Sequence, residues 1–352
     1  MTFQSFRRAH PNVAIVGATG AVGVELIRCL EERDFPLSRL KLLASPRSAG
    51  KQMSFRGQRL TVDALDDASF DEVDLAFFSA GSGTSKTYGP KAVAAGAVVV
   101  DNSSAFRMDP ACPLVVPEVN EAAMAGHQGI IANPNCVAII AAVPVAPLAQ
   151  AFGLKRVQMA TYQAASGAGA AAMEELRAST EAALRDATYE PKVLPHPYAF
   201  NLFSHNAEVD LETGYNGEEE KVIAECRRIL DRPELPIGVT CIRVPVLRAH
   251  AIAMTLEFDR PVTPDEARAV LARAPGVRIV DDRAANHFPM PSEAQGQGDV
   301  LAGRIRQDLS DPSGRSIALF VAGDQLLKGA ALNAVQIAER LFAQATAALE
   351  QA

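Results

Sequence analysis

The sequence predicts an α/β protein with two domains, an N-terminal doubly wound domain and an α+β domain built on a mostly antiparallel sheet. The first third of the chain alternates short apolar runs with helical patterns, which is typical of a parallel sheet covered on both faces. From about Leu154 the β-type segments become longer, and only two helical patterns lie among them. The length of 352 residues is enough for two buried cores.

The first domain is expected to span residues 1–135. Its predicted strands are Val13–Val16, Leu40–Ala44, Leu75–Ser79 and Ala97–Val100. Helical patterns cover Ala21–Arg33 and Lys86–Ala95. Because crossovers between parallel strands are right-handed, this alternation predicts a doubly wound sheet.

The second domain is expected to span residues 136–325. Its predicted strands are Arg156–Gln163, Val239–Val246, Ala251–Phe258 and Val300–Gln307, and its predicted helices are Ala170–Arg185 and Pro264–Ala272. The stretch Tyr189–Asn216 is rich in Pro, Asn and aromatic residues and predicts a long ordered loop. Apolar residues at helical spacing over Leu326–Leu349 predict that the C-terminal segment, residues 326–352, packs back on the first domain and completes it.

The composition argues against several classes of protein. The formal net charge of −7 does not favour a nucleic-acid-binding surface. The longest apolar run, Val137–Leu148, is too short for a membrane span and contains two prolines. Met1–His10 is basic and lacks the apolar stretch of a secretory signal. The five dispersed cysteines form no CxxC pair, so we expect a cytoplasmic protein without disulfides or a metal site.

A glycine-rich turn, Gly17-Ala18-Thr19-Gly20-Ala21-Val22-Gly23, follows the first predicted strand and opens a helix. Glycines there let the backbone approach a pyrophosphate, and the helix N-terminus offers N–H donors to it. The turn therefore predicts a Rossmann-like dinucleotide site. Its candidate cofactor-binding residues are Gly17, Thr19, Gly20, Ala21 and Val22. The alternative is a tight connection without a ligand.

The end of the second predicted strand indicates which cofactor binds. An NAD enzyme usually carries an acidic residue there, which binds the ribose 2′-hydroxyl. Here Ala44 is followed by Ser45, Pro46, Arg47 and Ser48, with no acidic residue as far as Lys51. Because a guanidinium binds phosphate through two parallel hydrogen bonds, Ser45, Arg47 and Ser48 favour the 2′-phosphate of NADP. The alternative is a solvated loop that is merely basic.

The turn Asn133-Pro134-Asn135 places Cys136 at or next to the start of a helix. The helix dipole there favours the thiolate, which is the reactive form of cysteine. On this pattern alone Cys136 is either a nucleophile or a small buried hydrophobic residue.

The chain resembles the aspartate-β-semialdehyde dehydrogenase family, in blocks of sequence that are spread over nearly its whole length. The matching blocks are Gly17–Gly23, Ala44–Lys51, Asp101–Arg107, Val116–Asn120, Asn133–Cys136, Thr161–Ala164, Ser166–Gly169, Val239–His250, Gly303–Arg306, Gly323–Gln325 and Lys328–Ala334. So many ordered blocks make the resemblance specific, and it favours Cys136 as the nucleophile.

The resemblance implies NADPH-dependent reductive dephosphorylation of L-4-aspartyl phosphate to L-aspartate 4-semialdehyde, in lysine/diaminopimelate, methionine and threonine biosynthesis. It implies that Cys136 forms a thioester and that His250 is the general acid/base. Gln163 would orient the substrate, as a third catalytic residue. The resemblance also implies a homodimer that is formed by the second domain.

The same resemblance implies substrate and cofactor contacts. Arg243 would bind the substrate carboxylate, and Glu218 would receive its ammonium group, although Glu218–Lys221 could also be a solvated helix start. The expected phosphate-binding residues are Arg107 and Lys221, beside Asn135 in the substrate site. Near the nicotinamide the expected residues are Ser166, Gly167 and Gln325. The remaining histidines, His10, His127, His196, His205 and His287, are expected to be ordinary loop residues.

One departure from the family pattern lies directly after the nucleophile, where Val137-Ala138 replaces Ser or Thr followed by Thr. Two hydroxyl groups that could bind the thiolate or an oxyanion are therefore missing. This departure keeps two alternatives open: a related acyl-phosphate reductase such as N-acetyl-γ-glutamyl-phosphate reductase, and a catalytically impaired paralogue that kept the fold.

Overall fold

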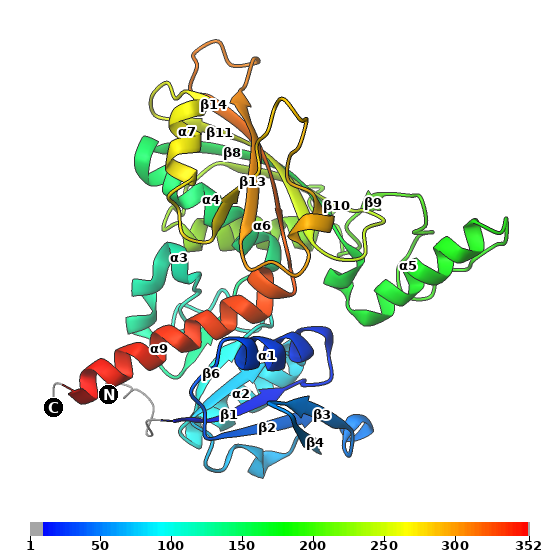
Figure 1. The fold of residues 1–352 in the computed structure, drawn as a ribbon, viewed down its shortest axis with the longest axis vertical. Helices are drawn as coiled ribbons and strands as arrows, with labels where there is room; N and C mark the ends of the chain where they lie inside the picture. Colours follow the sequence, from blue (N-terminus) through cyan, green and yellow to red (C-terminus); the bar gives the residue numbers. More distant parts are fainter. Residues whose placement is uncertain (1–9, 351–352) are drawn as a thin grey trace. The chain divides into compact units, whose positions relative to one another are not determined.

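The computed structural model describes residues 10–350, and the side chains of these residues up to 343. The prediction made for Met1–His10 therefore lies almost entirely outside the described residues. The chain forms two compact units (Figure 1). Unit 1 contains the chain up to Asn135 together with the chain from Ala330 onward, and unit 2 contains Cys136–Gly329.

Unit 1 is built on a seven-stranded sheet with the order β3-β4-β2-β1-β5-β6-β7. Its strands are β1 Asn12–Val16, β2 Arg39–Ala44, β3 Gln52–Phe55, β4 Gln58–Ala64, β5 Leu75–Phe78, β6 Val98–Asp101 and β7 Ile130–Ala132. All neighbours are parallel except β3 and β4, which form an antiparallel hairpin. The predicted doubly wound sheet is confirmed, and β3, β4 and β7 are additions that the sequence patterns did not predict.

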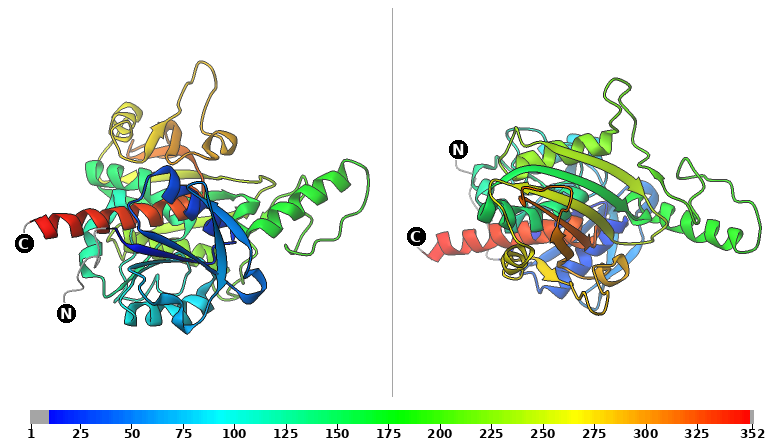
Figure 2. Two further views of the ribbon diagram at one scale, coloured as in Figure 1. Left: turned by 60° about the horizontal axis from the view of Figure 1, so that its bottom comes forward. Right: turned by 90° about the horizontal axis from the view of Figure 1, so that it is seen from above.

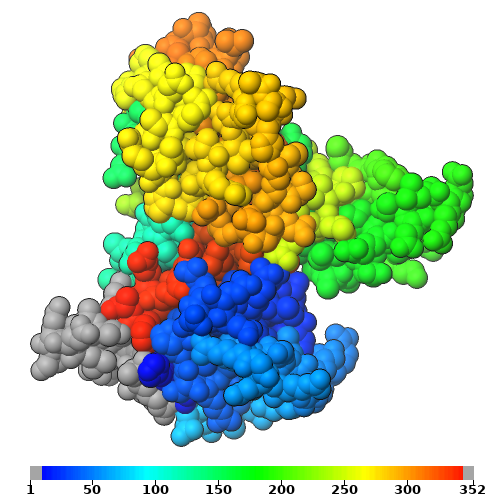
Figure 3. Space-filling model, in the orientation of Figure 1, coloured from blue at the N-terminus to red at the C-terminus, as the bar shows by residue number. Residues whose placement is uncertain are grey.

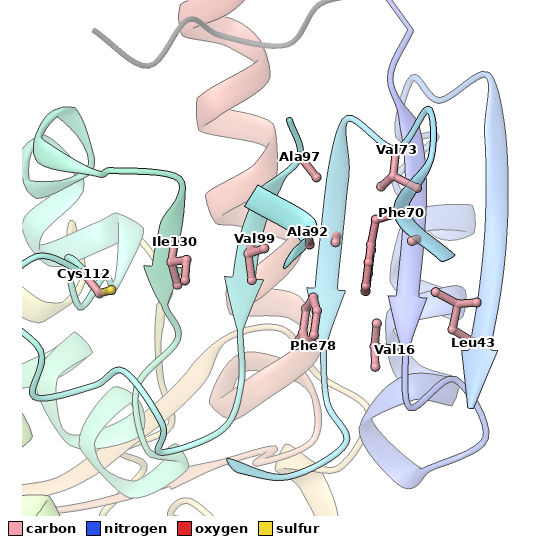
Figure 4. Packing of buried hydrophobic residues seen from close by; sticks show 12 residues of the cluster. Val16, Leu43, Phe70, Val73, Phe78, Ala92, Ala97, Val99, Cys112 and Ile130 are labelled. Carbon is pink, nitrogen blue, oxygen red and sulfur yellow. The ribbon is translucent and has the colours of Figure 1, made fainter. Parts of the chain in front are cut away.

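The core of unit 1 lies where helices cover this sheet. Helices α1 (Ala21–Glu32), α2 (Ser82–Ala94), α3 (Pro117–Asn120) and α9 (Leu332–Glu350) belong to it. On one face, Phe70 stacks on Phe78 of β5 with ring centroids 5.7 Å apart, and Val16, Leu43 and Val99 belong to the same cluster (Figure 4). These strands are apolar on both faces because helices cover both faces of a parallel sheet.

The C-terminal helix α9 packs against α1, α3 and β6. Arg33, at the end of α1, donates two hydrogen bonds to the Glu339 carboxylate, from Nε to Oε1 at 2.6 Å and from Nη2 to Oε2 at 2.7 Å. The α-helix starts at Leu332, later than the predicted Leu326, because a π-helical turn at Leu327–Ala331 comes before it.

Unit 2 is built on a second seven-stranded sheet with the order β12-β13-β14-β11-β8-β10-β9. Its strands are β8 Leu154–Gln163, β9 Phe203–Ser204, β10 Ile237–Arg243, β11 His250–Phe258, β12 Val277–Ile279, β13 Val300–Gln307 and β14 Ser316–Gly323. The β12–β13 and β8–β10 pairs are parallel and the other four pairs are antiparallel, so the sheet is mixed and mostly antiparallel as predicted.

In unit 2, helix α4 (Cys136–Phe152) packs against α6 (Gly217–Ile229) and α7 (Pro264–Leu271), and it also contacts strands of the sheet. Pro144 and Pro147 are both accommodated inside α4. Helix α5 (Ala170–Ala183) and the loop after it form an arm that extends away from the sheet of unit 2 (Figures 1 and 2). The predicted loop Tyr189–Asn216 is irregular apart from the two-residue strand β9.

A search of the described part of the chain finds no helix that has both the length and the apolar character of a membrane span.

Candidate active site

The glycine-rich turn of unit 1 follows β1, the strand at which the order of the sheet reverses. Gly17 has φ +89°, and a Cβ atom there would lie 2.5 Å from the Ser79 carbonyl oxygen at the end of β5. A Cβ atom on Gly23 would lie 2.2 Å from the Gly17 oxygen. Both positions therefore require glycine. The turn lies at the topological switch point, where open α/β sheets bind ligands.

Helix α1 begins directly after this turn. Its N-cap residue is Gly20, and among the described residues no side chain accepts a capping hydrogen bond at this end of the helix. The first N–H groups of a helix have no partner inside the helix and carry the positive end of its dipole. With no acidic residue in the first turn of α1, this end of the helix can accept an anion.

Residues at the end of β2 lie close to the glycine-rich turn. The backbone N–H groups of Gly17 and Ala18 both donate to the Leu43 oxygen, at 2.8 and 3.1 Å. The Thr19 hydroxyl lies 3.4 Å from the Ser48 hydroxyl. Ser45 and Arg47 are exposed in the short 3₁₀ turn region that follows β2, and Ser48 is buried.

Arg107 is fixed beside the segment that leads to the cysteine. Its Nε donates to the Asn133 oxygen at 3.0 Å, and its Nη2 donates to the Asn102 oxygen at 2.8 Å. The Asn133 side chain in turn accepts from Asn333 Nδ2 of α9 at 2.7 Å. Asn135, the next residue but one, is buried. Within unit 1 the structure thus brings Arg107 to the Asn133–Asn135 turn.

Cys136 is the first residue of α4 and differs from the other cysteines in its environment. It is partly exposed, whereas Cys29, Cys112, Cys226 and Cys241 are buried. Burial raises the pKa of the Cys29, Cys226 and Cys241 thiols to about 12, which makes their thiolates inaccessible at neutral pH.

Gly329 lies directly against the cysteine. A Cβ atom on Gly329 would lie 2.9 Å from the Cys136 Cβ and 3.3 Å from the Gln325 Cβ. The close approach of these two segments therefore depends on a residue without a side chain.

Gln163 ends β8 and is almost completely buried, with 1% of its surface exposed. Its Oε1 accepts from the Thr161 hydroxyl at 3.0 Å, and its Nε2 donates to Glu218 Oε1 at 3.2 Å. Lys221 Nζ lies 4.0 Å from the other Glu218 oxygen. Glu218 is buried at the first turn of α6, so the solvated helix start that the sequence left open does not describe this residue.

His250, the first residue of β11, is fully buried. The Ala164 N–H donates to its Nδ1 at 3.0 Å, so Nδ1 carries a lone pair and the proton of the neutral ring lies on Nε2. Among the described residues, Nε2 has no hydrogen-bond partner. Burial, followed by the charge of Arg243, lowers the pKa of His250 well below its usual value. The ring is therefore a neutral N–H donor with an unused hydrogen.

Arg243 ends β10 and lies next to His250. A Cβ atom on Gly167 would lie 3.1 Å from both Arg243 Nη1 and His250 Nε2, so these two side chains converge on Gly167. Ser166 accepts a short hydrogen bond from Gln325 Nε2, and Gln325 Oε1 accepts from the Ala249 N–H at 2.8 Å. Unit 2 thus collects the predicted residues Gln163, Ser166, Gly167, Glu218, Arg243, His250 and Gln325 around neighbouring strand ends.

His205 lies in a loop, as expected, but it also contacts a predicted site residue. Its Nε2 lies 2.7 Å from Arg243 Nη2, and the neighbouring Asn206 Oδ1 accepts from Arg243 Nε at 3.2 Å. The strand β9 explains this placement, because it pairs Phe203 with Arg243 and carries the following residues to the end of β10. A strand of only two residues is too short to produce a recognisable alternation of apolar and polar residues in the sequence.

The two sheet units of the structure correspond to two family models that match the sequence. The model of the "Semialdehyde dehydrogenase, NAD binding domain" matches residues 12–127, and that of the "Semialdehyde dehydrogenase, dimerisation domain" matches residues 145–328. The aspartate-semialdehyde dehydrogenase of Synechocystis sp. is 53% identical over 329 residues, which cover 94% of this chain and 96% of that protein. The Bacillus subtilis enzyme of the same name is 45% identical over 338 residues, covering 94% and 97%.

A solved structure agrees with these relatives. The crystal structure of aspartate semialdehyde dehydrogenase II from Vibrio cholerae has a TM-score of 0.91 and 40% identity, and covers 94% of this chain and 98% of that one. A complex of the Vibrio cholerae protein with ASA gives the same values. The chain therefore belongs to the aspartate-semialdehyde dehydrogenase family.

Proposed function

We propose that this chain catalyses the NADPH-dependent reductive dephosphorylation of L-4-aspartyl phosphate to L-aspartate 4-semialdehyde, with Cys136 as the nucleophile. The observation that carries the proposal is the cluster at the strand ends of unit 2. There the buried cation Arg243 lies next to the buried, neutral imidazole of His250. The same unit begins with Cys136, which is partly exposed, whereas the other four cysteines, all of them within the described residues, are buried. Membership of the family gives the substrate.

The residues of unit 1 fit NADP. The glycine-rich turn and the start of α1 can bind the pyrophosphate, and Ser45, Arg47 and Ser48 can bind a 2′-phosphate where no carboxylate opposes it. In unit 2, Ser166, Gly167 and Gln325 are the proposed contacts of the nicotinamide. The bound cofactor would supply the hydride that reduces the thioester.

Cys136 begins the reaction as a thiolate that attacks the acyl carbon of the substrate and displaces inorganic phosphate. Arg107 and Lys221 are the proposed ligands of this phosphate, because two cations match a dianionic leaving group. His250 uses its Nε2–H as a donor to the oxyanion of each tetrahedral intermediate on the Cys136 sulfur. When the last of these intermediates collapses, the aldehyde leaves and the sulfur is again a thiolate.

The amino-acid end of the substrate is recognised by opposite charges. Arg243 would bind the α-carboxylate, and Glu218 would receive the ammonium group. Gln163, which is hydrogen-bonded to both Thr161 and Glu218, would orient the acyl group. Asn135, which directly precedes Cys136 in the sequence, is a further proposed contact of the substrate. Burial of Glu218 and Arg243 makes these contacts selective, because an unpaired buried charge is costly.

We further propose that the protein is a cytoplasmic homodimer. The matched dimerisation domain supports a dimer. The arm formed by α5 and the loop after it projects from the rest of unit 2 (Figure 3). Its loop carries exposed apolar side chains, including Phe200, Leu202 and Leu211 at 72%, 60% and 96% exposure, which suit burial in an interface. The five cysteines, all within the described residues, form no disulfide, which suits a reducing compartment.

The test is oxidation of aspartate semialdehyde, the reverse of the proposed direction, with NADP and with or without inorganic phosphate. We expect phosphate-dependent formation of NADPH by the wild-type chain and none by Cys136→Ala. Normal turnover by Cys136→Ala would remove the assigned nucleophile. A parallel assay uses N-acetyl-glutamate semialdehyde, and activity on this substrate alone would identify the chain as the related reductase. Inactivity on both substrates would identify it as the catalytically impaired paralogue.

A further inference from the structure

The guanidinium of Arg243 is held by three acceptors of its own unit. Nε donates to Asn206 Oδ1 at 3.2 Å, Nη1 donates to the Ala164 oxygen at 3.3 Å, and Nη2 lies 2.7 Å from His205 Nε2. A guanidinium has five N–H groups. Among the described residues the other two, one on each terminal nitrogen, have no acceptor, and such a pair can bind a carboxylate through two parallel hydrogen bonds.

All three acceptors are uncharged, although Arg243 is only 4% exposed. Buried arginines are usually paired with a carboxylate, because an isolated buried charge is costly. A carboxylate in place of His205 would neutralise Arg243 and compete with an anionic ligand. Uncharged acceptors fix the orientation of the guanidinium and leave its positive charge available.

We propose that His205 is a positioning residue that uses its neutral imidazole to hold the Arg243 guanidinium for the substrate carboxylate. This inference rests on the proposed function, in which Arg243 binds that carboxylate. It assigns a role in substrate recognition to the loop that follows β9.

The charges around His205 support a neutral ring. Burial, and then the positive charge of Arg243, lower the pKa of His205 to about 4, and Lys221 of α6 acts in the same direction. Glu218 of α6 acts in the opposite direction but does not compensate. The fourth neighbour is His250 of β11, whose own pKa is lowered in part by His205. A protonated ring would place a second cation against Arg243.

The shortest contact determines the tautomer of His205. A neutral imidazole has one lone pair, yet two N–H donors face the ring, Arg243 at Nε2 and the Ala207 backbone at Nδ1, which lies 3.2 Å away. The contact with Arg243 is shorter and involves a charged donor, so it takes precedence. His205 then carries its proton on Nδ1, and the contact with Ala207 is not a hydrogen bond in that state.

Kinetic measurements on three variants test the role. His205→Ala removes the acceptor, and we expect the KM for aspartate semialdehyde to rise about 10-fold, with kcat and the KM for NADP within about 2-fold, because one hydrogen bond to a charged group is lost. His205→Gln keeps a neutral acceptor and should recover most of the wild-type KM. His205→Glu should raise the KM more than His205→Ala does, because it neutralises Arg243.

The matched control is His196→Ala, in the same loop. His196 packs edge-on against Phe203 with ring centroids 5.2 Å apart, and it should change the KM little. Equal KM increases in His196→Ala and His205→Ala, or no recovery in His205→Gln, would reduce His205 to a packing residue and overturn the proposal. Thermal unfolding of each variant shows whether the fold is kept.

A second readout does not depend on turnover. Long-range ¹H–¹⁵N spectra of histidine-labelled protein, assigned with His205→Gln, should show a neutral Nδ1–H tautomer of His205 at about pH 6, where an unperturbed histidine is largely protonated. A protonated ring at that pH would overturn the proposal. A wild-type chain without activity on aspartate semialdehyde would instead remove the proposed function, and the inference with it.

Discussion

At the scale of single residues, the site combines groups whose ordinary properties have been changed by burial. His250 is neutral because a charged ring would be desolvated next to Arg243, and its Nδ1 is occupied by the Ala164 N–H. The same burial makes Nε2–H a strong donor to a developing negative charge, since little water competes with it.

The lowered pKa of His250 makes stability depend on pH. The unfolded chain protonates this histidine below about pH 6.5, whereas the folded chain keeps it neutral, so stability falls as the pH decreases. We expect His250→Asn to reduce the slope of unfolding free energy against pH by about 1.4 kcal/mol per pH unit below about pH 6. Urea unfolding at constant protein concentration measures the slope. Identical slopes for variant and wild type would show that His250 is already charged in the folded protein.

Gly329 sets the position of the cysteine. Gly329→Ala places a methyl group 2.9 Å from the Cys136 Cβ, so one of the two segments must move. We expect kcat to fall by about 10- to 100-fold, since small displacements of a reacting group are costly. Gly126→Ala, where a Cβ atom meets no neighbour within 4 Å, is the control and should keep full activity. Full activity in both variants would contradict the close fit.

At the scale of elements, the departure from the family pattern after Cys136 has a packing reason. Val137 and Ala138 are both 0% exposed in the first turn of α4, so their apolar side chains are shielded from solvent. Hydroxyl groups at these positions would need partners there.

Restoring the family threonine at the second of these positions should therefore be costly. We expect Ala138→Thr to destabilise the protein by about 1–3 kcal/mol in urea unfolding, because the site is already filled. Gln150→Thr, at an exposed position of α4, should change stability by less than about 0.5 kcal/mol. An Ala138→Thr protein as stable as wild type, or more active, would indicate room for the hydroxyl group.

The end of β2 carries the prediction on cofactor choice. Arg47→Glu replaces an exposed cation with an acid, and we expect the KM for NADP to rise by about 10-fold or more, since a charge-assisted contact is lost and a repulsion is gained. The KM for NAD, which has no 2′-phosphate, should change by less than about 3-fold. Steady-state kinetics with both cofactors measures the difference, and parallel changes would contradict a 2′-phosphate site.

At the scale of the whole molecule, unit 1 depends on both ends of the chain. The first six residues of α9, from Leu332 to Ile337, are buried except for Gln336, which itself donates to Glu118 of α3 at 3.0 Å. A chain that ends at Gly329 loses this layer. We expect it to lose NADP binding, measured by calorimetric titration, and to aggregate. A chain that ends at Glu350 should behave as wild type; NADP binding by the shorter chain would show that α9 is dispensable.

Much of the fold could be predicted because buried strands leave apolar runs. The predicted bounds of β1, β2, β5 and β6 all lie within one residue of the observed bounds. The hairpin β3–β4 was missed because most of its side chains are exposed and polar. A prediction that relies on apolar runs in the sequence cannot detect such an exposed edge hairpin.

The site was predictable where motifs carry the chemistry, and less so where tertiary pairing does. Gln163, Arg243 and His250 follow from resemblance, and the structure places them at neighbouring strand ends. The environment of His205 depends on the register of β9 with β10, which joins residues about 40 positions apart. Propensity and periodicity describe local structure and do not contain that register.

The discontinuous composition of unit 1 has a consequence for synthesis on the ribosome. Residues 136–329 form one uninterrupted unit, so this part can complete its fold while the last segment of the chain is still being made. Unit 1, by contrast, lacks α9 until the segment from Ala330 onward has been synthesised. Until then the apolar surface that α9 covers on α1, α3 and β6 stays exposed, and chaperones are expected to engage this part of unit 1.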